Sequence, residues 1–390
     1  MYDFDSIINR KGTQCEKWDE LESVFGSADI LPFWVADMDF RIAPEIRDAL
    51  QKVLDHGVLG YPIMHQKAKE SVAYWQAHRH QWNVPAEAIG FVPGVITGLV
   101  VALHAFTQQG DTVIIQTPVY HPFHATVTKN DRKLLENPLI KDEKGYRMDF
   151  DHLKSIITPA VKAIIISNPH NPIGRVWRKE ELSQLAEICA ANNIVIFSDE
   201  IHQDIIYSGF KHTPLASVSE KAAKQTVTFV APSKTFNIPG LSASASIILN
   251  PEIRSQYNQT ADRLHLSGIN LMGIAALEAA YTQGEPWLNE LLPYIEENRD
   301  LLKDFIATRL PKARMDTIEG MYVCWIDFRE YGLNDKELQK ILVEKARVAL
   351  SSGLSFGKNG DGFVRMNIGC PRPLLREGLE RIAAAFADYN

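Results

Sequence analysis

Between residues 89 and 250 the chain repeats one pattern, in which a short apolar run is followed by a turn and then by a helical pattern. The apolar runs cover residues 89–92, 112–116, 163–167, 194–198, 225–230 and 243–249. Runs of this length, bounded by turn residues and alternating with helices, are typical of a mostly parallel sheet covered by helices on both faces. The sequence therefore predicts an α/β fold with a mostly parallel central sheet.

The segments on either side of this region predict a second, smaller α+β domain. Helical patterns are expected at 44–54, 66–80, 270–281, 287–310, 335–346 and 373–389, and strand-like pieces at 321–328 and 363–367. Residues 31–40 are expected to form an extended segment. We expect a large domain of residues 46–282 and a small domain formed by residues 1–45 together with 283–390. A chain of 390 residues is long enough for two such domains.

Composition argues against several kinds of partner. The formal net charge of -7 gives no electrostatic reason to expect nucleic acid or an anionic membrane. The four cysteines are scattered without a C-x-x-C pair, and His121 and His124 lack a third ligand at metal-like spacing. We therefore expect neither a disulfide framework nor a metal site.

The first residues of the chain and the lengths of its apolar runs indicate where in the cell the protein is expected. Asp3 and Asp5 stand where a signal peptide needs a basic end followed by an apolar run. No stretch approaches the roughly 20 apolar residues of a membrane span. The sequence predicts a soluble, cytoplasmic protein.

A single lysine, Lys234, stands in a small polar turn just beyond the apolar run at 225–230. Desolvating an ammonium group is costly and lowers its pKa, so part of such an amine would be neutral at physiological pH. A neutral amine can attack a carbonyl and form a Schiff base. The alternative is an ordinary surface lysine in a strand-to-loop turn, because lysines are rarely buried.

Ligands of open α/β sheets bind beyond the carboxyl ends of the strands, so the residues after the other runs are informative. Gly94 follows the run at 89–92 and opens a helix, whose N-terminus favours an anion such as a phosphate. The glycine spacing is not that of a nucleotide P-loop. An ordinary strand-to-helix turn is the alternative.

Three further strand ends carry polar or aromatic residues. Tyr120 could lie flat on a planar ligand, although a tyrosine packed at the rim is an equally simple explanation. Asn171 stands in a rigid turn with two Asn-Pro steps, which holds its amide outward as a hydrogen-bond donor. Asp199 ends an apolar run, where a carboxylate is costly unless a positive group meets it.

These five features match the parts of pyridoxal 5′-phosphate (PLP), namely a phosphate, a flat ring, a phenolic oxygen, a ring nitrogen and an aldehyde. A lysine that forms a Schiff base and an acidic partner for the pyridinium nitrogen are the groups that PLP chemistry needs. Each feature has an ordinary explanation when taken alone. Their occurrence together, each at a strand end, favours a PLP site.

The motifs NPHNPIG at 168–174, SDE at 198–200 and SKTF at 233–236 resemble those of fold-type I PLP-dependent enzymes, the aspartate aminotransferase superfamily. More narrowly, SDEIH at 198–202, KTFNIP at 234–239 and the segments at 11–18, 31–40 and 363–371 resemble the MalY/PatB group of cystathionine β-lyases, also described as cysteine-S-conjugate β-lyases. The likeness spans the chain. It implies the fold-type I PLP-dependent transferase fold and a homodimer with active sites at the subunit interface.

The resemblance implies a role for each matching residue around the cofactor ring. Lys234 would form the Schiff base and then move the Cα proton. Asp199 would pair with the pyridinium nitrogen, and Asn171 would donate a hydrogen bond to the phenolic oxygen. Tyr120 would stack on the ring and, with Lys234 and Tyr61, belong to the catalytic residues.

The resemblance also implies how the phosphate and the substrate are held. The backbone N–H groups of Val95 and Ile96 and the Ser233 hydroxyl would bind the phosphate, and His202 is grouped with the cofactor-binding residues. Tyr61 matches a tyrosine that reaches the neighbouring subunit's phosphate. Arg365 matches the arginine that binds the substrate α-carboxylate bidentately.

Two departures from the family pattern bear on the activity. Many aminotransferases carry an arginine eight residues after the lysine, whereas Ser242 stands here, as a small hydroxyl residue does in the β-lyase group. Ala231 replaces a serine three residues before the lysine, so phosphate binding loses one hydroxyl.

The resemblance implies α,β-elimination of L-cystathionine or a related cysteine-S-conjugate to a thiol (homocysteine), pyruvate and ammonia, and Ser242 favours this reaction. Transamination on the same scaffold stays open, because both reactions share the first proton transfer and the cofactor supplies the chemistry. A third possibility is a PLP-fold protein that mainly binds a regulator. The presence of Lys234, Asp199 and Arg365 argues against it.

Overall fold

The computed structural model describes residues 2–64, 66–143 and 145–389. Their contacts divide into two compact units. The sheet unit comprises residues 42–170 and 175–288, and the terminal unit comprises the residues up to 41, the short segment 171–174 and the residues from 289 onward. The domain boundaries expected from the sequence, 46–282 for the large domain, stay a prediction that limited proteolysis would test.

A seven-stranded sheet forms the centre of the sheet unit, with the strand order β2-β10-β9-β8-β7-β3-β4. The strands are β2 (Ile89–Val92), β3 (Thr112–Ile115), β4 (Lys133–Glu136), β7 (Val161–Ser167), β8 (Val195–Asp199), β9 (Thr226–Val230) and β10 (Ser244–Ile247). β3, β4, β7, β8 and β9 pair in parallel, whereas β10 runs antiparallel to both of its neighbours. The predicted mostly parallel sheet is thus confirmed, and all six predicted apolar runs form strands of it.

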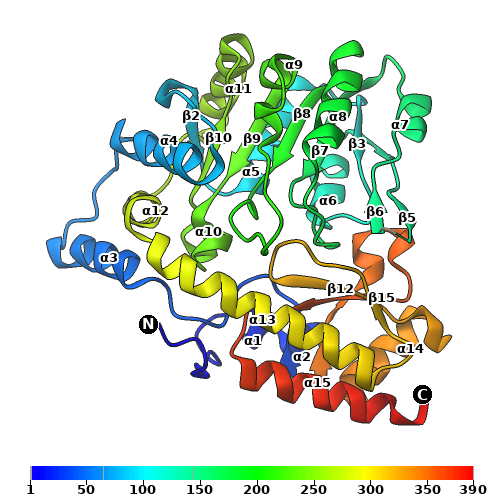
Figure 1. Ribbon diagram of the computed structural model, residues 1–390. Helices are drawn as coiled ribbons and strands as arrows, with labels where there is room; N and C mark the ends of the chain where they lie inside the picture. Colours follow the sequence, from blue (N-terminus) through cyan, green and yellow to red (C-terminus); the bar gives the residue numbers. More distant parts are fainter. Residues whose placement is uncertain (1, 65, 144, 390) are drawn as a thin grey trace. The chain divides into compact units, whose positions relative to one another are not determined.

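Helices cover both faces of this sheet (Figure 1). The connection from β2 to β3 through α5 (Val95–Phe106) and the connection from β7 to β8 through α8 (Lys179–Ala191) cross the sheet in opposite directions. Because such crossovers are right-handed, α5 and α8 lie on opposite faces. A buried apolar cluster under α5 includes Leu99, Phe197 and Phe229.

The remaining elements of the sheet unit are short or peripheral. The helices are α3 (Pro44–His56), α4 (Gln66–His80), α6 (Pro122–Thr128), α7 (Phe150–Ile156), α9 (Glu220–Gln225), α10 (Pro232–Thr235), α11 (Pro251–Arg263) and α12 (Leu271–Gln283). A small hairpin joins β5 (Ile140–Asp142) to β6 (Gly145–Arg147). The helices predicted at 44–54, 66–80 and 270–281 are confirmed by α3, α4 and α12.

The terminal unit contains a four-stranded antiparallel sheet in the order β11-β12-β15-β14. Its strands are β11 (Arg314–Met315), β12 (Val323–Asp327), β14 (Ser351–Ser352) and β15 (Phe363–Asn367), and a separate parallel pair joins β1 (Leu31–Pro32) to β13 (Val348–Ala349). Its helices are α1 (Glu16–Asp19), α2 (Leu21–Phe25), α14 (Asp335–Lys340) and α15 (Arg372–Phe386), and most of α13 (Glu285–Arg309) belongs to it. The predicted α+β character is confirmed for this unit.

Two predicted elements differ in detail. The helix expected at 335–346 is α-helical only through α14 and continues as a π-helical turn (Ile341–Lys345). The segment expected to be extended at 31–40 pairs as a strand only over β1. Beyond β1, the Asn367 side chain holds it by donating from Nδ2 to the carbonyls of Val35 and Asp37, each over 2.6 Å. Within the part of the chain that the structure describes, no helix is long and apolar enough to cross a membrane.

Candidate active site

The strand directions bring the predicted cofactor residues of the sheet unit to one edge of the sheet. β3, β7, β8 and β9 are parallel, and β2 points the same way because β10 is antiparallel to both β2 and β9. The carboxyl ends of these five strands therefore share one edge. Val95 follows β2, and Tyr120 follows β3. Asp199 is the last residue of β8, and Lys234 follows β9.

Asp199 is the last residue of β8 and is only 5% exposed. Its carboxylate accepts a hydrogen bond from the Ile201 N–H over 3.1 Å. Burial raises the pKa of Asp199 to about 7, and the charge of Lys234, which favours the ionised form, offsets this only in part. A buried carboxyl with a raised pKa can be stabilised in its ionised form by a cationic N–H group that donates a hydrogen bond to it.

Lys234 lies in α10, a single helical turn rather than the irregular turn expected from the sequence. Pro232 is suited to the first turn of this helix, and Ala231 caps it in an extended conformation. The Lys234 side chain is half-buried, and its charge acts on the Asp199 carboxylate. The lysine and the carboxylate are thus electrostatically coupled at the ends of neighbouring strands.

The N-terminus of α5 supplies the predicted phosphate donors. Gly94 precedes the helix with φ of +106°, a conformation that favours glycine, and it leads directly into Val95 and Ile96. Gly98 lets this helix lie close to the sheet, since a Cβ atom there would stand 2.5 Å from the Phe229 ring. The first N–H groups of a 12-residue helix are suited to an anion.

Three other predicted cofactor residues lie in the sheet unit. Tyr120 is half-buried and meets the Phe123 ring edge to face, with 5.9 Å between ring centroids. Ser233 and His202 are buried, with 8% and 4% of their surface exposed. Ser242, where many aminotransferases have arginine, is exposed and adopts φ of +49°.

The predicted substrate ligand Arg365 lies in the terminal unit, and so does Asn171. The Arg365 Nη1 donates to the Asn171 Oδ1 over 3.1 Å, and Nη2 donates to the Trp34 carbonyl over 2.8 Å. The guanidinium also stands 4.9 Å from the centre of the Phe356 ring. These contacts fix the plane of the guanidinium, as bidentate recognition of a carboxylate requires.

Tyr61 lies in the loop after α3 and is fully exposed in the single chain. Val58, Leu59 and Ile63 in the same loop are also exposed, each by more than 60%. The structure of one chain therefore does not bring Tyr61 together with the other predicted site residues. An exposed apolar segment of this kind is typical of a contact surface.

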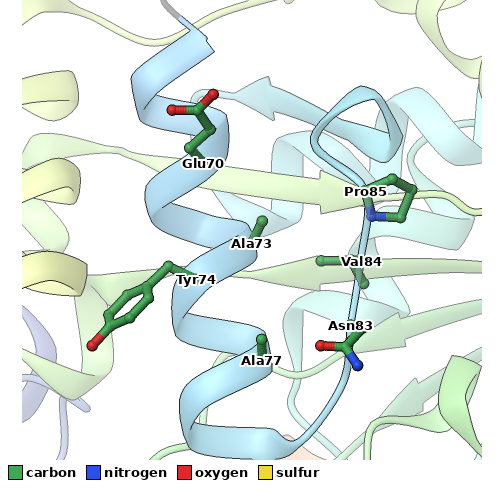
Figure 2. Close-up of a pocket in the computed structure, with 7 residues that line it drawn as sticks. All are labelled: Glu70, Ala73, Tyr74, Ala77, Asn83, Val84 and Pro85. Carbon is green, nitrogen blue, oxygen red and sulfur yellow. The ribbon is translucent and has the colours of Figure 1, made fainter.

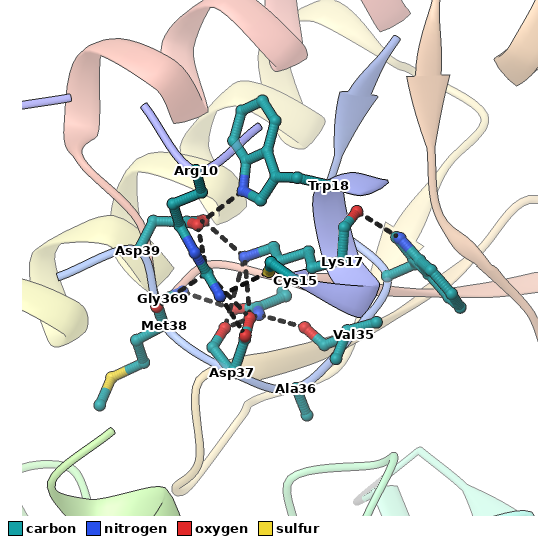
Figure 3. Close-up of polar contacts among 12 residues, drawn as sticks. Arg10, Cys15, Lys17, Trp18, Val35, Ala36, Asp37, Met38, Asp39 and Gly369 are labelled. Carbon is teal, nitrogen blue, oxygen red and sulfur yellow. Dashed lines mark hydrogen bonds and ion pairs between the residues drawn. The ribbon is translucent and has the colours of Figure 1, made fainter. Parts of the chain in front are cut away.

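The sequence interpretation missed a buried ion cluster in the terminal unit (Figure 3). Lys17 is completely buried, and its Nζ stands 2.5 Å from the Asp39 Oδ2 and 3.7 Å from the Asp37 Oδ1. Arg10 and Trp18 also donate to Asp39, over 2.7 and 3.0 Å. Four of the five residues lie in the motifs at 11–18 and 31–40, which carried the family resemblance but gave no sign of this pairing.

A surface pocket of about 650 Å³ lies elsewhere on the sheet unit, along α4 and the segment after it (Figure 2). Its lining residues are Glu70, Ala73, Tyr74, Ala77, Asn83, Val84 and Pro85. None of the predicted site residues is among them. The pocket therefore plays no part in the candidate active site.

Comparison with known proteins agrees with this geometry. A family model for aminotransferase class I and II matches residues 28–382. Cystathionine beta-lyase PatB from Bacillus subtilis is 46% identical over 385 residues, which cover 98% of this chain and 100% of the relative. The chain belongs to the aminotransferase class I and II family and, within it, to the group that contains PatB.

Two solved structures extend the comparison. Cystalysin from Treponema denticola, which contains a PLP cofactor, superposes with a TM-score of 0.97 and 37% identity, and both chains are covered completely. A PLP-bound C–S lyase from Staphylococcus hominis superposes with a TM-score of 0.91 and 32% identity over 99% of this chain and 98% of that one. The predicted fold-type I architecture is thereby confirmed.

Proposed function

We propose that the protein is a PLP-dependent carbon–sulfur β-lyase that cleaves L-cystathionine or a related cysteine-S-conjugate. With the uptake of one water molecule, the products are a thiol (homocysteine from cystathionine), pyruvate and ammonia. The observation that carries the proposal is the coupling of Asp199 and Lys234 at the ends of neighbouring parallel strands, in a chain 46% identical to a cystathionine β-lyase along its whole length.

The residues present fit PLP. The buried Asp199 carboxyl, whose pKa is raised to about 7, matches a protonated ring nitrogen, which would restore its ionised form. The N-terminus of α5 and the Ser233 hydroxyl would hold the phosphate, and Tyr120 would lie against the ring. When bound, PLP acts as an electron sink that stabilises negative charge at the substrate Cα.

The chain's own residues would then carry out the proton transfers. Lys234 would hold the cofactor, be displaced by the substrate amine, and then take the proton from the substrate Cα as a general base. Arg365 would orient the substrate by its α-carboxylate. Its bond to the Asn171 Oδ1 would leave the amide N–H group of Asn171 to donate to the phenolic oxygen. The departing β-thiolate would be protonated by Lys234 or by one of the tyrosines, Tyr61 or Tyr120.

A homodimer is part of this proposal. The exposed apolar loop around Tyr61 supports it, because the family resemblance assigns this tyrosine to the phosphate of a neighbouring subunit. His202 is retained as a cofactor-side residue on the basis of the same resemblance. A cytoplasmic location, the expectation from the sequence, would be tested by cell fractionation.

Aminotransferase activity is the second candidate function, because the family includes enzymes of that class. The two activities separate in one experiment, in which the PLP-loaded protein is mixed with cystathionine and no keto acid. We expect pyruvate and free thiol in equal amounts. If neither appears, and added keto acid drives amino-group exchange, the protein is an aminotransferase and the lyase proposal is wrong.

A further inference from the structure

The sheet unit contains a second buried polar cluster that the proposed reaction leaves unused. It consists of two carboxylates and two imidazoles, those of Asp204, Glu200, His80 and His212, and each residue is less than a tenth exposed. Burying this many polar groups is costly unless each is hydrogen-bonded in a fixed geometry. Glu200 directly follows Asp199 in the sequence, and Asp204 is hydrogen-bonded to Thr235, the residue after Lys234.

Asp204 is attached to the helical turn that carries Lys234. The Thr235 hydroxyl donates to the Asp204 Oδ2 over 2.7 Å, and Thr235 directly follows Lys234 in α10 and is fully buried. The Asp204 Oδ1 accepts from the Trp75 Nε1 over 3.0 Å and from the His80 Nε2 over 2.8 Å. Burial opposes the charge of Asp204, but the bonds from His80 and Thr235 outweigh it and lower the pKa of this carboxyl.

Glu200 fixes the backbone on both sides of Asp199. The Ser198 hydroxyl donates to the Glu200 Oε1 over 2.8 Å, so the residues before and after Asp199 are bonded to each other. The Leu215 N–H also donates to Oε1, over 2.9 Å, and the His212 Nε2 donates to Oε2 over 2.8 Å. The end of β8 is therefore held by contacts that do not involve the Asp199 carboxyl itself.

The two carboxylates are linked through the imidazoles. The rings of His80 and His212 meet edge to face, with 5.2 Å between their centroids. Each imidazole donates from Nε2, because an ionised carboxylate can only accept. Burial lowers the pKa of His80, although the hydrogen bond to Asp204 and the charge of that carboxylate act in the opposite direction.

We propose that Asp204, His80, His212 and Glu200 are positioning residues for the reaction. Asp204 places Lys234 through Thr235, and Glu200 places Asp199 through Ser198. A misplacement of about 1 Å between reacting groups can lower the reaction rate about a hundredfold, so the loss of these positioning contacts should be measurable as a loss of rate. The inference rests on the proposed function, since it assumes that Lys234 and Asp199 serve the cofactor.

The link to Lys234 is tested by Thr235→Val, which keeps the branched shape and removes only the hydroxyl donor. We expect kcat for thiol release to fall about tenfold with KM changed less than about twofold, because positioning acts on the reaction step rather than on substrate binding. The pH at which the absorbance of the bound PLP changes should also shift. Thr235→Ser keeps the hydroxyl donor, so its kcat and the pH of its absorbance change should both equal those of the wild type.

A matched control removes a buried threonine hydroxyl that is bonded within another helix, α11. Thr260 is 6% exposed and donates to the Gln256 carbonyl within α11 over 3.0 Å. Thr260→Val should leave kcat and the absorbance titration of the bound PLP as in the wild type, whatever its melting temperature. The comparison separates loss of position from general loss of stability.

The link to Asp199 is tested by Ser198→Ala. We expect the dissociation constant of PLP, measured by titrating the cofactor-free protein, to rise about fivefold, as loss of one hydrogen bond to a charged group would allow. Ser71→Ala is the matched control, because Ser71 is buried and donates to the Ala68 carbonyl within its own helix, α4, over 2.8 Å. Its PLP affinity should equal that of the wild type.

Two results would overturn the inference. If wild-type protein binds PLP and releases thiol, but Thr235→Val and Ser198→Ala match it within twofold in kcat, PLP affinity and absorbance titration, the cluster serves only stability. The proposed function then stands. If wild-type protein shows neither bound-PLP absorbance nor thiol release, the proposed function fails and the positioning role fails with it.

Discussion

Each of the two units contains a buried aspartate, and the pKa values of these two aspartates are shifted in opposite directions. In the terminal unit, Asp39 receives Lys17, Arg10 and Trp18, and these groups lower its pKa although burial opposes the charge. In the sheet unit, burial raises the pKa of Asp199 to about 7, because the charge of Lys234 offsets it only in part. A buried carboxylate whose charge is compensated by groups of its own chain stabilises the fold. A buried carboxylate whose charge is not fully compensated lowers the stability of the fold, and it is suited to bind a cationic group of a ligand.

The lysines of the two regions differ in burial, since Lys17 is completely buried and Lys234 is half-buried. Burial disfavours the ammonium of Lys17, but Asp39 and Asp37 outweigh it and raise its pKa, so this lysine stays charged. Lys234 stands half-buried on a four-residue helical turn. We therefore expect substitutions in the first region to change stability and those in the second to change chemistry.

The largest effect is expected for Lys234→Ala. Thiol and pyruvate release should fall by at least about 10³-fold, because both the covalent hold on the cofactor and the general base are removed. The melting temperature of the cofactor-free protein should stay near that of the wild type. Lys52→Ala, at an exposed position on α3, is the control. Retention of more than a tenth of the activity would contradict the role of Lys234.

The opposite outcome is expected for Lys17→Met. Removing one partner of a buried ion pair should lower the free energy of unfolding by about 3–5 kcal/mol, because Asp39 and Asp37 lose a compensating charge. Denaturant titration measures this change, and Lys52→Met should stay within about 0.5 kcal/mol of the wild type. The folded variant should retain kcat. A large loss of kcat without loss of stability would break the distinction between the regions.

A smaller effect on chemistry is expected for Arg365→Lys. An ammonium cannot reproduce the planar fork that Asn171, Trp34 and Phe356 hold in place, so kcat/KM should fall about 10- to 100-fold, mainly through KM. Steady-state kinetics with cystathionine measure it. Arg347→Lys, at an exposed ion pair with Asp29, is the matched control. Equal kcat/KM in Arg365→Lys and wild type would remove Arg365 from the site.

Local patterns predicted six of the seven strands of the central sheet and the residues at their ends, because burial on both faces leaves apolar runs bounded by turns. The patterns missed β4, an edge strand whose residues are exposed or half-buried. They could not reveal that β10 runs antiparallel, since an apolar run carries no sign of direction. The short helix at Lys234 also escaped prediction, because four residues show no helical period. The positions of the strand ends can thus be predicted from the sequence, whereas the directions of the strands cannot.

The polar clusters were not predictable from the sequence for a different reason. His80 and Asp204 are separated by 124 residues and meet only through the fold. Lys17 lies in α1 and Asp39 lies 22 residues later, outside any helix or strand, so no periodicity relates them. Tyr61 was found through family resemblance alone, and its expected partner lies outside a single chain.

The most direct test of the contrast between Asp39 and Asp199 is the pH dependence of stability in cofactor-free protein. Since the folded pKa of Asp199, about 7, exceeds the unfolded value near 3.8, its stabilising contribution is present below about pH 4 and is lost as pH rises through 7. Relative to Asp199→Asn, wild-type protein should lose about 2–3 kcal/mol of unfolding free energy between pH 5 and pH 8, and saturating PLP should abolish this loss. A difference that does not vary with pH would contradict the account.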